Sequence, residues 1–374
     1  MKRKICIAFI IGGLRLGGAE QQLYNVLAGL DRSRFRPVVI TLGLDLNEFW
    51  REPITRLGIS VFHVPRKFGR FIRTLKIYGI LRSEKAQIVH SWSFFINPYS
   101  ALTGRLAGTP LRFGSMRENY DLLADTPLIR RIGYWGLDTI TTNSVSATKQ
   151  VEELKLTRGR VCTLPNGVSI PVPITQTERD SIRAELGCSS QSLLIGTIGR
   201  LDKNKNHVML LQVFAKLLQD WPRLDLAIIG EGPLKCRLQA LAEELGIAAR
   251  VRLAGNIPFA ARFLPAMDVC CMTSYTEGMP NLIMEAAAAG IPVVSTSCGD
   301  SVRLIEHGVS GFVVSPDDSL AMGACLHQLL GDRDQRVRMG RAGREKMQRE
   351  YGLASMVARI SEVYERALGE KCIS

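Results

Sequence analysis

Short apolar runs alternate with stretches of helical periodicity along the whole chain. Apolar runs of about four to eight residues, bounded by turn-forming residues, are typical of buried parallel strands. We expect such strands at 4–11, 37–42, 60–64, 87–90, 111–115, 139–143, 160–164, 193–199, 224–230, 251–254, 267–273, 291–296 and 311–314. Helical periodicity predicts helices at 19–30, 207–219, 234–245 and 281–289, and from residue 319 to the end. This alternation predicts the α/β class, with doubly wound parallel sheets.

A turn-rich segment at 164–174 interrupts the alternation. It contains Pro165, Pro171 and Pro173, which favour an extended connection between domains. A chain of 374 residues is also long for a single core. We therefore predict two Rossmann-like domains, at 1–168 and 169–351, that face each other across a cleft.

The composition is that of a globular protein, with 46% hydrophobic and 22% charged residues. No apolar run approaches the roughly 20 residues that a membrane-spanning helix needs. The first apolar run enters Gly12 and Gly13 without a small-residue cleavage site, which favours a strand over a signal peptide. Nine cysteines without C-x-x-C pairs are typical of reduced thiols. We expect a cytoplasmic protein with neither a metal site nor a disulfide framework.

The positive charge is concentrated in the first half of the chain. Residues 1–170 hold 25 basic and 12 acidic residues, whereas the remaining residues hold 23 of each. Such asymmetry indicates an anionic partner for the first half, which can be a membrane surface, a phosphorylated substrate or nucleic acid. No nucleic-acid-binding motif occurs, so we do not expect nucleic acid to be the partner.

The segment 66–85 carries seven of these basic residues and one acidic residue. Its apolar residues recur at helical spacing, which predicts an amphipathic helix with an apolar stripe of Phe68, Phe71, Ile72, Leu75 and Tyr78. Such a helix can lie in the interface of an anionic membrane. The stripe can also pack on the sheet of its own domain. The pattern leaves both open, and the charge excess favours the membrane.

Two carboxylates, Glu277 and Glu285, flank a loop in the second half. Gly278 and Pro280 favour a turn, and Pro280 suits the start of the helix that follows. A strand, a Gly/Pro loop and a helix N-terminus at the carboxyl edge of a sheet form an anion site. Carboxylates beside such a site can accept hydrogen bonds from sugar hydroxyls. The pattern therefore predicts a ligand with both phosphate and hydroxyl groups, such as a nucleotide sugar.

Two cations, Arg200 and Lys205, follow the strand at 193–199. At this edge of a sheet they can grip a diphosphate and neutralise the charge that a phosphate leaving group develops. A first glycine loop at 12–18 permits close approach to a phosphate but lacks the G-x-G-x-x-G spacing and a Walker lysine. This spacing argues against a nicotinamide-dependent dehydrogenase.

Together these motifs resemble a retaining glycosyltransferase of family 4 with the two-domain GT-B fold. The resemblance spans nearly the whole chain, in the family's order. It rests on G-G-A-E at 17–20, P-N-G-V at 165–168, G-R…K at 199–205, I-G-E-G-P at 229–233, V-R-L-A-G at 251–255 and E-x7-E at 277–285. It implies that the first domain takes the acceptor and that the second binds a UDP- or GDP-linked sugar. We also expect a C-terminal helix at about 352–370 that packs back on the first domain.

The resemblance implies roles for individual residues. Gly18 would contact the donor diphosphate, and Arg200 and Lys205 would grip it. Glu285 would bind the ribose, and Glu277 would hold the donor sugar. Of these, Arg200, Lys205 and Glu277 are the expected catalytic residues. The other donor-binding residues would be Gly278, Met279, Asn281, Leu282, Asn256 and Ile257.

The chain departs from the family pattern in two places. Many relatives carry a histidine near the reacting sugar, whereas Arg117 occupies the nearest matching place here. His90 is the other acceptor-side candidate, although a lone histidine at a strand end is more often structural. Relatives also often show G-G-x-x-E after the last strand, and the segment 298–303 does not match it, so its contacts stay unassigned.

The implied activity is transfer of a hexose from a nucleotide sugar with retention, without a metal or other cofactor. The expected acceptor is a lipid-linked glycan of cell-surface polysaccharide or glycolipid biosynthesis, met at the inner face of the cytoplasmic membrane. Retention follows from the resemblance alone. The alternatives are a GT-B nucleotide-sugar epimerase and a glycosyltransferase with a soluble acceptor. The intact set of four charged site residues argues against an inactive binding protein.

Overall fold

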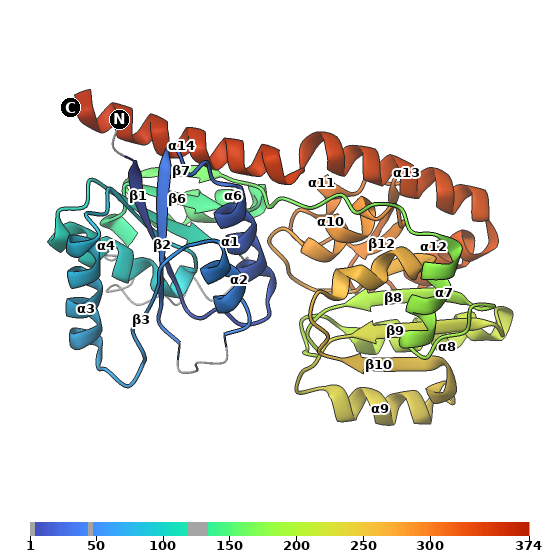
Figure 1. Ribbon diagram of the computed structural model, residues 1–374. Coiled ribbons are helices and arrows are strands. Elements are labelled where there is room, and N and C mark those ends of the chain that lie inside the picture. The colour runs from blue at the N-terminus through green and yellow to red at the C-terminus, as the bar shows by residue number, and fades with distance from the viewer. Residues whose placement is uncertain (1–3, 44–47, 118–133, 374) are drawn as a thin grey trace. The chain divides into compact units, whose positions relative to one another are not determined.

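A computed structural model of the protein describes residues 4–43, 48–117 and 134–373. These residues form two compact units, Met1–Gly167 with Leu353–Ser374, and Val168–Gly352. Each unit is built around one β-sheet (Figure 1). The chain thus leaves the first unit after Gly167, one residue before the boundary predicted after residue 168. It returns to the first unit at Leu353, where a C-terminal helix was predicted at about 352–370.

The sheet of the first unit has seven parallel strands in the order β3-β2-β1-β4-β5-β6-β7. The chain steps outward from β1 to β3 and then crosses to β4, so the topological switch lies between β1 and β4. The strands are β1 (Ile5–Ile11), β2 (Phe35–Thr41), β3 (Val61–His63), β4 (Ile88–Ser91), β5 (Leu111–Met116), β6 (Thr139–Thr142) and β7 (Arg160–Thr163). The helices are α1 (Gly18–Gly29), α2 (Arg51–Arg56), α3 (Arg70–Ser83), η1 (Phe94–Ile96), α4 (Asn97–Ala107), α6 (Val145–Glu153) and α14 (Leu353–Ile373).

Strand β1 is apolar on both faces because helices cover both sides of its sheet. Phe9 faces the core that α1 and α14 complete, where its ring lies edge-on to Tyr364 at a centroid distance of 6.5 Å. Ile10 faces the opposite core, together with Ile77 of α3. A strand buried in this way reads as an unbroken apolar run, which is why the sequence pattern identified it.

The sheet of the second unit has six parallel strands in the order β10-β9-β8-β11-β12-β13. Its topological switch lies between β8 and β11. The strands are β8 (Leu193–Ile198), β9 (Leu224–Ile229), β10 (Val251–Gly255), β11 (Val269–Met272), β12 (Val293–Thr296) and β13 (Gly311–Val314). The helices are α7 (Gln176–Glu185), α8 (His207–Asp220), α9 (Lys235–Glu244), η3 (Ala248–Arg250), η4 (Ala260–Ala266), α10 (Asn281–Ala288), α11 (Ser301–Leu304), α12 (Ser319–Gly331) and α13 (Arg333–Glu350).

The strands that the sequence pattern predicted are confirmed, and the ends of each lie within two residues of the prediction. The helical region expected from residue 319 to the end is divided into α12, α13 and α14. Asp332 makes the first division, because its carboxylate caps α13 by accepting a hydrogen bond from the backbone N–H of Gln335 at 2.7 Å. Along the described ranges we find no helix with the length and apolar character needed to cross a bilayer.

The side chain of Gln22 in α1 holds the point where the chain leaves the first unit. Its amide nitrogen donates to the carbonyl of Gly167 at 2.9 Å, and its amide oxygen accepts from the N–H of Gly167 at 3.0 Å. A Cβ on Gly167 would lie 2.9 Å from the Cβ of Met356 in α14. This close approach explains why the turn-rich segment has a glycine at position 167.

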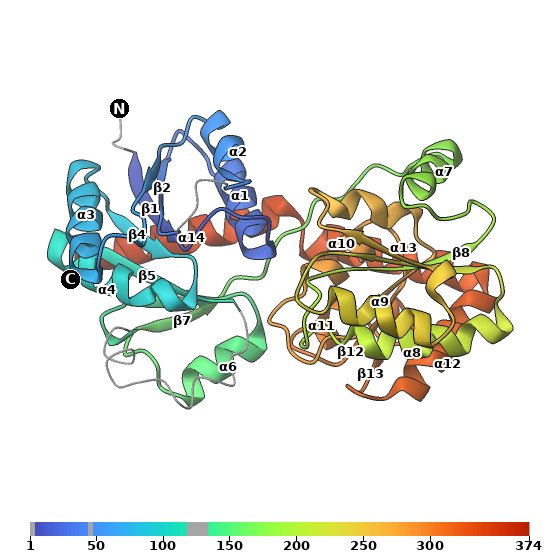
Figure 2. The same ribbon diagram turned by 90° about the horizontal axis from the view of Figure 1, so that it is seen from below.

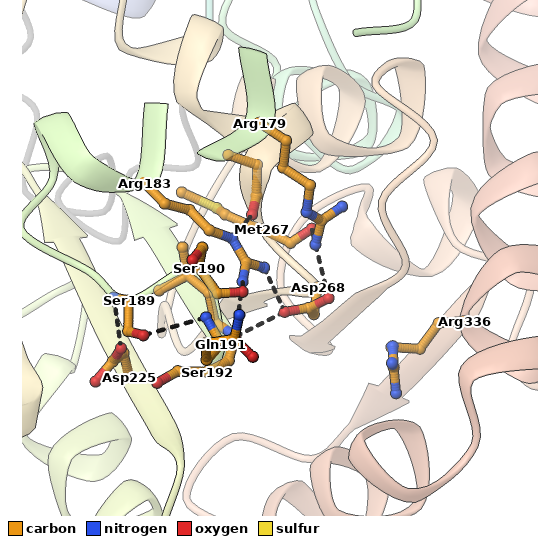
Figure 3. A network of polar contacts seen from close by, with 12 residues as sticks. Arg179, Arg183, Ser189, Ser190, Gln191, Ser192, Asp225, Met267, Asp268 and Arg336 are labelled. Atoms are coloured by element: carbon orange, nitrogen blue, oxygen red, sulfur yellow. Dashed lines mark hydrogen bonds and ion pairs between the residues drawn. The ribbon is translucent and has the colours of Figure 1, made fainter. Parts of the chain in front are cut away.

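A cluster of ion pairs fastens α7 to the amino edge of the second sheet (Figure 3). Asp268, directly before β11, pairs with Arg179 and with Arg183 of α7 at 2.7 Å each. The Asp268 carboxylate also accepts a hydrogen bond from the N–H of Leu194 at 2.7 Å. The Arg183 side chain is 4% exposed and also donates to the backbone carbonyls of Ala266, Ser190 and Ser192. Ligands of such sheets bind at the opposite, carboxyl edge, so this cluster supports the fold.

Candidate active site

Opposite charges meet at the topological switch of the second sheet. The ammonium group of Lys205, in the loop after β8, forms an ion pair with the carboxylate of Glu277, in the loop after β11. The two side chains are 26% and 16% exposed, so the pair lies mostly below the surface. Because open α/β sheets bind ligands at this switch, the pair marks the centre of the candidate site. Both residues were predicted as site residues from the sequence, but their pairing was not.

Asn204 holds these two loops together. Its backbone carbonyl accepts a hydrogen bond from the N–H of Tyr275 at 2.8 Å. Its side-chain oxygen accepts from the N–H and the hydroxyl of Thr276 at 3.0 and 2.7 Å, and its amide nitrogen donates to the Thr276 carbonyl at 2.8 Å. Asn204 therefore fixes the backbone directly before Lys205 to the backbone directly before Glu277. This role of Asn204 was not predictable from the sequence, because no local pattern shows which distant loop an asparagine will bind.

The segment 298–303, which the sequence analysis left unassigned, braces the Glu277 loop from another side. The N–H of Asp300 donates to the carbonyl of Gly278 at 2.9 Å. Gly299 has a φ of +53°, and a Cβ there would lie 2.2 Å from the carbonyl oxygen of Glu277. A residue with a side chain cannot come this close, so glycine is needed at this position.

Helix α10 begins directly after this loop, and the predicted donor-binding residues here lie in the loop (Gly278 and Met279) or in the helix (Asn281, Leu282 and Glu285). Gly278, Met279 and Leu282 are buried, and the last two side chains belong to the core of the second unit. Their contribution to a ligand would therefore come from the backbone. Asn281 and Glu285 are half-buried and lie four positions apart, which places them on the same side of the helix.

The loops after β8 and β9 approach each other through a glycine. Gly230 has a φ of +155°, and a Cβ on it would lie 1.9 Å from the carbonyl oxygen of Gly199. The N–H of Leu201 then donates to the carbonyl of Glu231 at 3.0 Å. This contact fixes the backbone that carries Arg200.

Arg200 is the most exposed of the predicted catalytic residues. Its side chain is 71% exposed, and its Nε lies 3.7 Å from the carboxylate of Asp202, a loose ion pair. Asn256 and Ile257 follow β10 at the same edge of the sheet, with β9 between β10 and β8. The predicted donor-binding residues of the second unit are thus gathered along one carboxyl edge.

In the first unit, Arg117 follows β5 at the carboxyl edge. Its guanidinium carbon lies 3.6 Å from the centroid of the Trp92 ring, and its Nη1 donates to the side-chain oxygen of Asn166 at 3.2 Å. Trp92 in turn donates from Nε1 to the carbonyl of Ala19, in the first turn of α1, at 2.9 Å. Burial lowers the pKa of Arg117 to about 9. Arg117 is thus a poorly hydrated cation beside the glycine loop that contains Gly18.

His90, the other acceptor-side candidate, lies inside the first unit. Its Nδ1 is 2.6 Å from the hydroxyl of Tyr364, and its Nε2 is 2.9 Å from the hydroxyl of Ser115 and 3.1 Å from that of Thr141. Burial lowers the pKa of His90 well below its ordinary value, so the ring is neutral. Because both ring nitrogens are engaged within the core, the geometry favours a structural role for His90 and leaves Arg117 as the better acceptor-side candidate.

A cavity of about 460 Å³ in the first unit is not lined by any of the predicted site residues. Among its lining residues, Lys4 precedes β1, Arg36 lies near the start of β2, and Gln87 precedes β4. The cavity is therefore at the amino edge of the sheet. Ligands of parallel sheets bind at the other edge, so we do not include this cavity in the candidate site.

Comparison with known proteins assigns the chain to a family. The family described as glycosyl transferases group 1 matches residues 178–346, and that described as glycosyltransferase family 4 matches residues 16–170. The D-inositol 3-phosphate glycosyltransferase of Corynebacterium urealyticum is 30% identical over 331 residues, which cover 82% of this chain and 78% of the relative. The lipopolysaccharide core biosynthesis glycosyltransferase LpsE of Rhizobium meliloti is 26% identical over 368 residues, 95% of this chain and 96% of that one.

Among solved structures, Anabaena Alr3699/HepE in complex with UDP-glucose is similar with a TM-score of 0.84 at 18% identity, covering 97% of this chain and 100% of that one. This similarity shows the fold, which is the GT-B arrangement of two parallel-sheet α/β domains. The chain belongs to glycosyltransferase family 4 and is a glycosyltransferase. The family and the fold class predicted from the sequence are confirmed.

Proposed function

We propose that the protein transfers a hexose from a UDP- or GDP-linked sugar to a lipid-linked glycan, with retention at the anomeric carbon and without a metal ion. The pathway would be cell-surface polysaccharide or glycolipid synthesis at the inner face of the cytoplasmic membrane. The observation that carries the proposal is the Lys205–Glu277 pair at the switch between β8 and β11. It stands beside the N-terminus of α10, where a diphosphate is favoured.

The chemistry of transfer suits this edge of the sheet. When the bond between the sugar and the diphosphate breaks, positive charge develops at the anomeric carbon and negative charge on the departing diphosphate. Lys205 and Arg200 can neutralise the leaving group, which is the task a metal ion performs in other enzymes. The carboxylate of Glu277, held in place by Lys205, can accept hydrogen bonds from the hydroxyls of the donor sugar.

Retention is supported by the family resemblance. The acceptor hydroxyl would attack on the face that the diphosphate leaves, and its proton would pass to the departing phosphate oxygen. A new bond to the acceptor oxygen then replaces the bond to the phosphate oxygen, with no covalent intermediate on the protein.

The lipid-linked acceptor is supported by the basic first half of the chain and by the name of the relative LpsE. A soluble phosphorylated acceptor is the second candidate, because the relative from Corynebacterium urealyticum is named for D-inositol 3-phosphate. A phosphate group on either acceptor would meet the poorly hydrated guanidinium of Arg117.

The donor is tested by a thermal-shift screen of the whole protein against UDP-, GDP- and ADP-hexoses. A ligand that binds the folded protein raises its midpoint of unfolding. We expect a selective shift with UDP- or GDP-hexoses. Equal midpoints with all nucleotide sugars and with buffer would contradict the proposed donor class.

Glu285→Ala is expected to weaken binding of the nucleotide sugar identified in this screen, raising its Kd by about 10- to 100-fold. A hydrogen bond between a charged group and a hydroxyl contributes about 1.5–3 kcal/mol. Isothermal titration measures the change, and the same variant should bind the free nucleobase as wild type does. A Kd equal to that of the wild type would refute the assignment of Glu285 to the ribose.

A further inference from the structure

Helix α3, formed by the amphipathic segment, exposes its apolar stripe to solvent. The face of α3 that packs on the unit consists of Arg73, Ile77 and Leu81, which lie four positions apart. The other side carries apolar side chains that are 37% to 74% exposed, namely Phe71, Ile72, Leu75 and Tyr78. These four stripe residues therefore do not pack on the sheet of their own unit, which was the alternative that the sequence left open. The fifth, Phe68, precedes α3 and is half-buried.

Helix α4 packs beside α3 and also exposes apolar side chains. At their N-terminal ends, the guanidinium carbon of Arg73 in α3 lies 5.0 Å from the ring centroid of Tyr99 in α4. At their C-terminal ends, Arg82 donates to the carbonyl of Ala107 at 3.5 Å. These contacts indicate that the two helices run side by side in the same direction. Figure 2 shows α3 and α4 next to each other in the first unit.

The outer side of α4 is apolar as well. Leu102 and Leu106 are 51% and 57% exposed and lie four positions apart, on one side of the helix. The six exposed apolar side chains of the two helices, Phe71, Ile72, Leu75, Tyr78, Leu102 and Leu106, are here called the α3–α4 surface. Large apolar side chains exposed on two neighbouring helices of a folded unit indicate an interaction site.

Cations accompany this surface. Arg66, Lys67, Arg70 and Lys76 are exposed, in α3 or in the residues just before it. The ammonium groups of Lys67 and Lys76 lie 5.7 and 4.6 Å from the ring centroid of Phe68. Across the part of the chain that the structure describes, none of these four cations forms an ion pair with a carboxylate. They are therefore available to an anionic partner outside the protein.

We propose that the α3–α4 surface docks on the surface of an anionic phospholipid bilayer. The apolar side chains enter the boundary between head groups and acyl chains, and the four cations contact the lipid phosphates. The two helices carry exposed apolar side chains next to cations that have no carboxylate partner among the described residues. An anionic bilayer matches both features, because it offers a layer of lipid phosphates above an apolar layer. The inference rests on the proposed function, because a lipid-linked acceptor would be presented at such a surface.

Arg73 does not belong to the docking cations. The sequence pattern placed it among the basic residues of the helix, but it is 9% exposed and donates to the carbonyl of Leu42 at 3.3 Å. Its replacement would disturb the packing of α3. The charge variant for the test is therefore Arg66→Gln, Lys67→Gln, Arg70→Gln and Lys76→Gln.

The test is flotation of the whole protein with phosphatidylcholine vesicles that contain or lack phosphatidylglycerol. Wild type is expected to bind the anionic vesicles, to bind less as salt rises, and to ignore the neutral ones. The charge variant should lose about 100-fold or more in partition coefficient. Phe71→Ser with Leu75→Ser, and separately Leu102→Ser with Leu106→Ser, should each lose about tenfold or more.

Leu320→Ser with Val337→Ser is the matched control, since these side chains of the second unit are 76% and 61% exposed. This control should bind vesicles as wild type does. Each variant is first checked for an unchanged thermal midpoint. If an apolar double variant has a changed thermal midpoint, the proposal is judged on the charge variant alone. Its four replaced side chains are exposed, so their replacement should not disturb the fold.

Equal binding to neutral vesicles, or wild-type binding by the charge variant, would overturn the proposal. Wild-type binding by the α4 variant would overturn the role of α4. The nucleotide-sugar shift, measured on the same samples, separates the two claims. A shift without vesicle binding contradicts the docking surface and keeps the proposed function, whereas vesicle binding without a shift supports docking and contradicts the function.

Discussion

Lys205→Ala and Arg200→Ala are each expected to lower kcat by about 100- to 1,000-fold, the loss seen when one preorganised donor to a developing anion is removed. Charge on the leaving diphosphate is greatest in the transition state, so turnover should fall more than donor affinity does. Steady-state kinetics with the donor from the thermal-shift screen, together with the Kd of that donor, measures both effects. Full activity in either variant would reject the role of that cation.

Lys203→Ala supplies the control for this prediction. Lys203 is an exposed cation of the same loop, and we expect its replacement to leave kcat unchanged. Asn204→Ala tests the alignment of the loops, because it removes three hydrogen bonds to Thr276 and leaves both charges in place. Its kcat should fall while the KM for the donor changes little. A thermal midpoint equal to that of wild type would separate this positioning role from a loss of fold.

Asp268→Asn is expected to lower the free energy of unfolding by about 3–5 kcal/mol, because it leaves the guanidinium groups of Arg179 and Arg183 without their carboxylate inside the protein. Denaturation with urea, followed by circular dichroism, measures the change. Glu345→Gln is the control, since Glu345 pairs with Arg341 on the surface of α13, where the side chains are 57% and 81% exposed. That pair should contribute less than about 1 kcal/mol. Equal losses in the two variants would contradict the stabilising role of the buried cluster.

The strands were predictable because parallel strands buried on both faces leave unbroken apolar runs in the sequence. Helix α7 was missed although its start carries a recognisable signal. Thr175 accepts from the N–H of Glu178, whose carboxylate accepts from the N–H of Thr175 in return. This capping box was visible in the sequence. The helix behind it contains only two apolar residues, Ile182 and Ala184, so it leaves no apolar run or stripe in the sequence.

The residues of the candidate site were predictable from the sequence, but the contacts between them were not. Lys205 and Glu277 are 72 positions apart, and their pairing depends on the strand order that brings β8 beside β11. His90 shows the same limit, because its partner Tyr364 comes from a helix 274 positions away. Spacing also could not decide which side of α3 is buried, since the burial of Arg73 depends on Tyr99 and Leu42.

The central claim is metal-independent, retaining transfer of a sugar. It is tested most directly by NMR of the anomeric proton when the protein is incubated with the identified nucleotide sugar, a panel of alkyl glycosides as analogues of a lipid-linked glycan, and excess chelator. We predict a glycoside product with the anomeric configuration of the donor, formed at the same rate with and without the chelator. An inverted product, a loss of activity that Mn²⁺ or Mg²⁺ restores, or epimerisation of the nucleotide sugar without transfer would contradict the account.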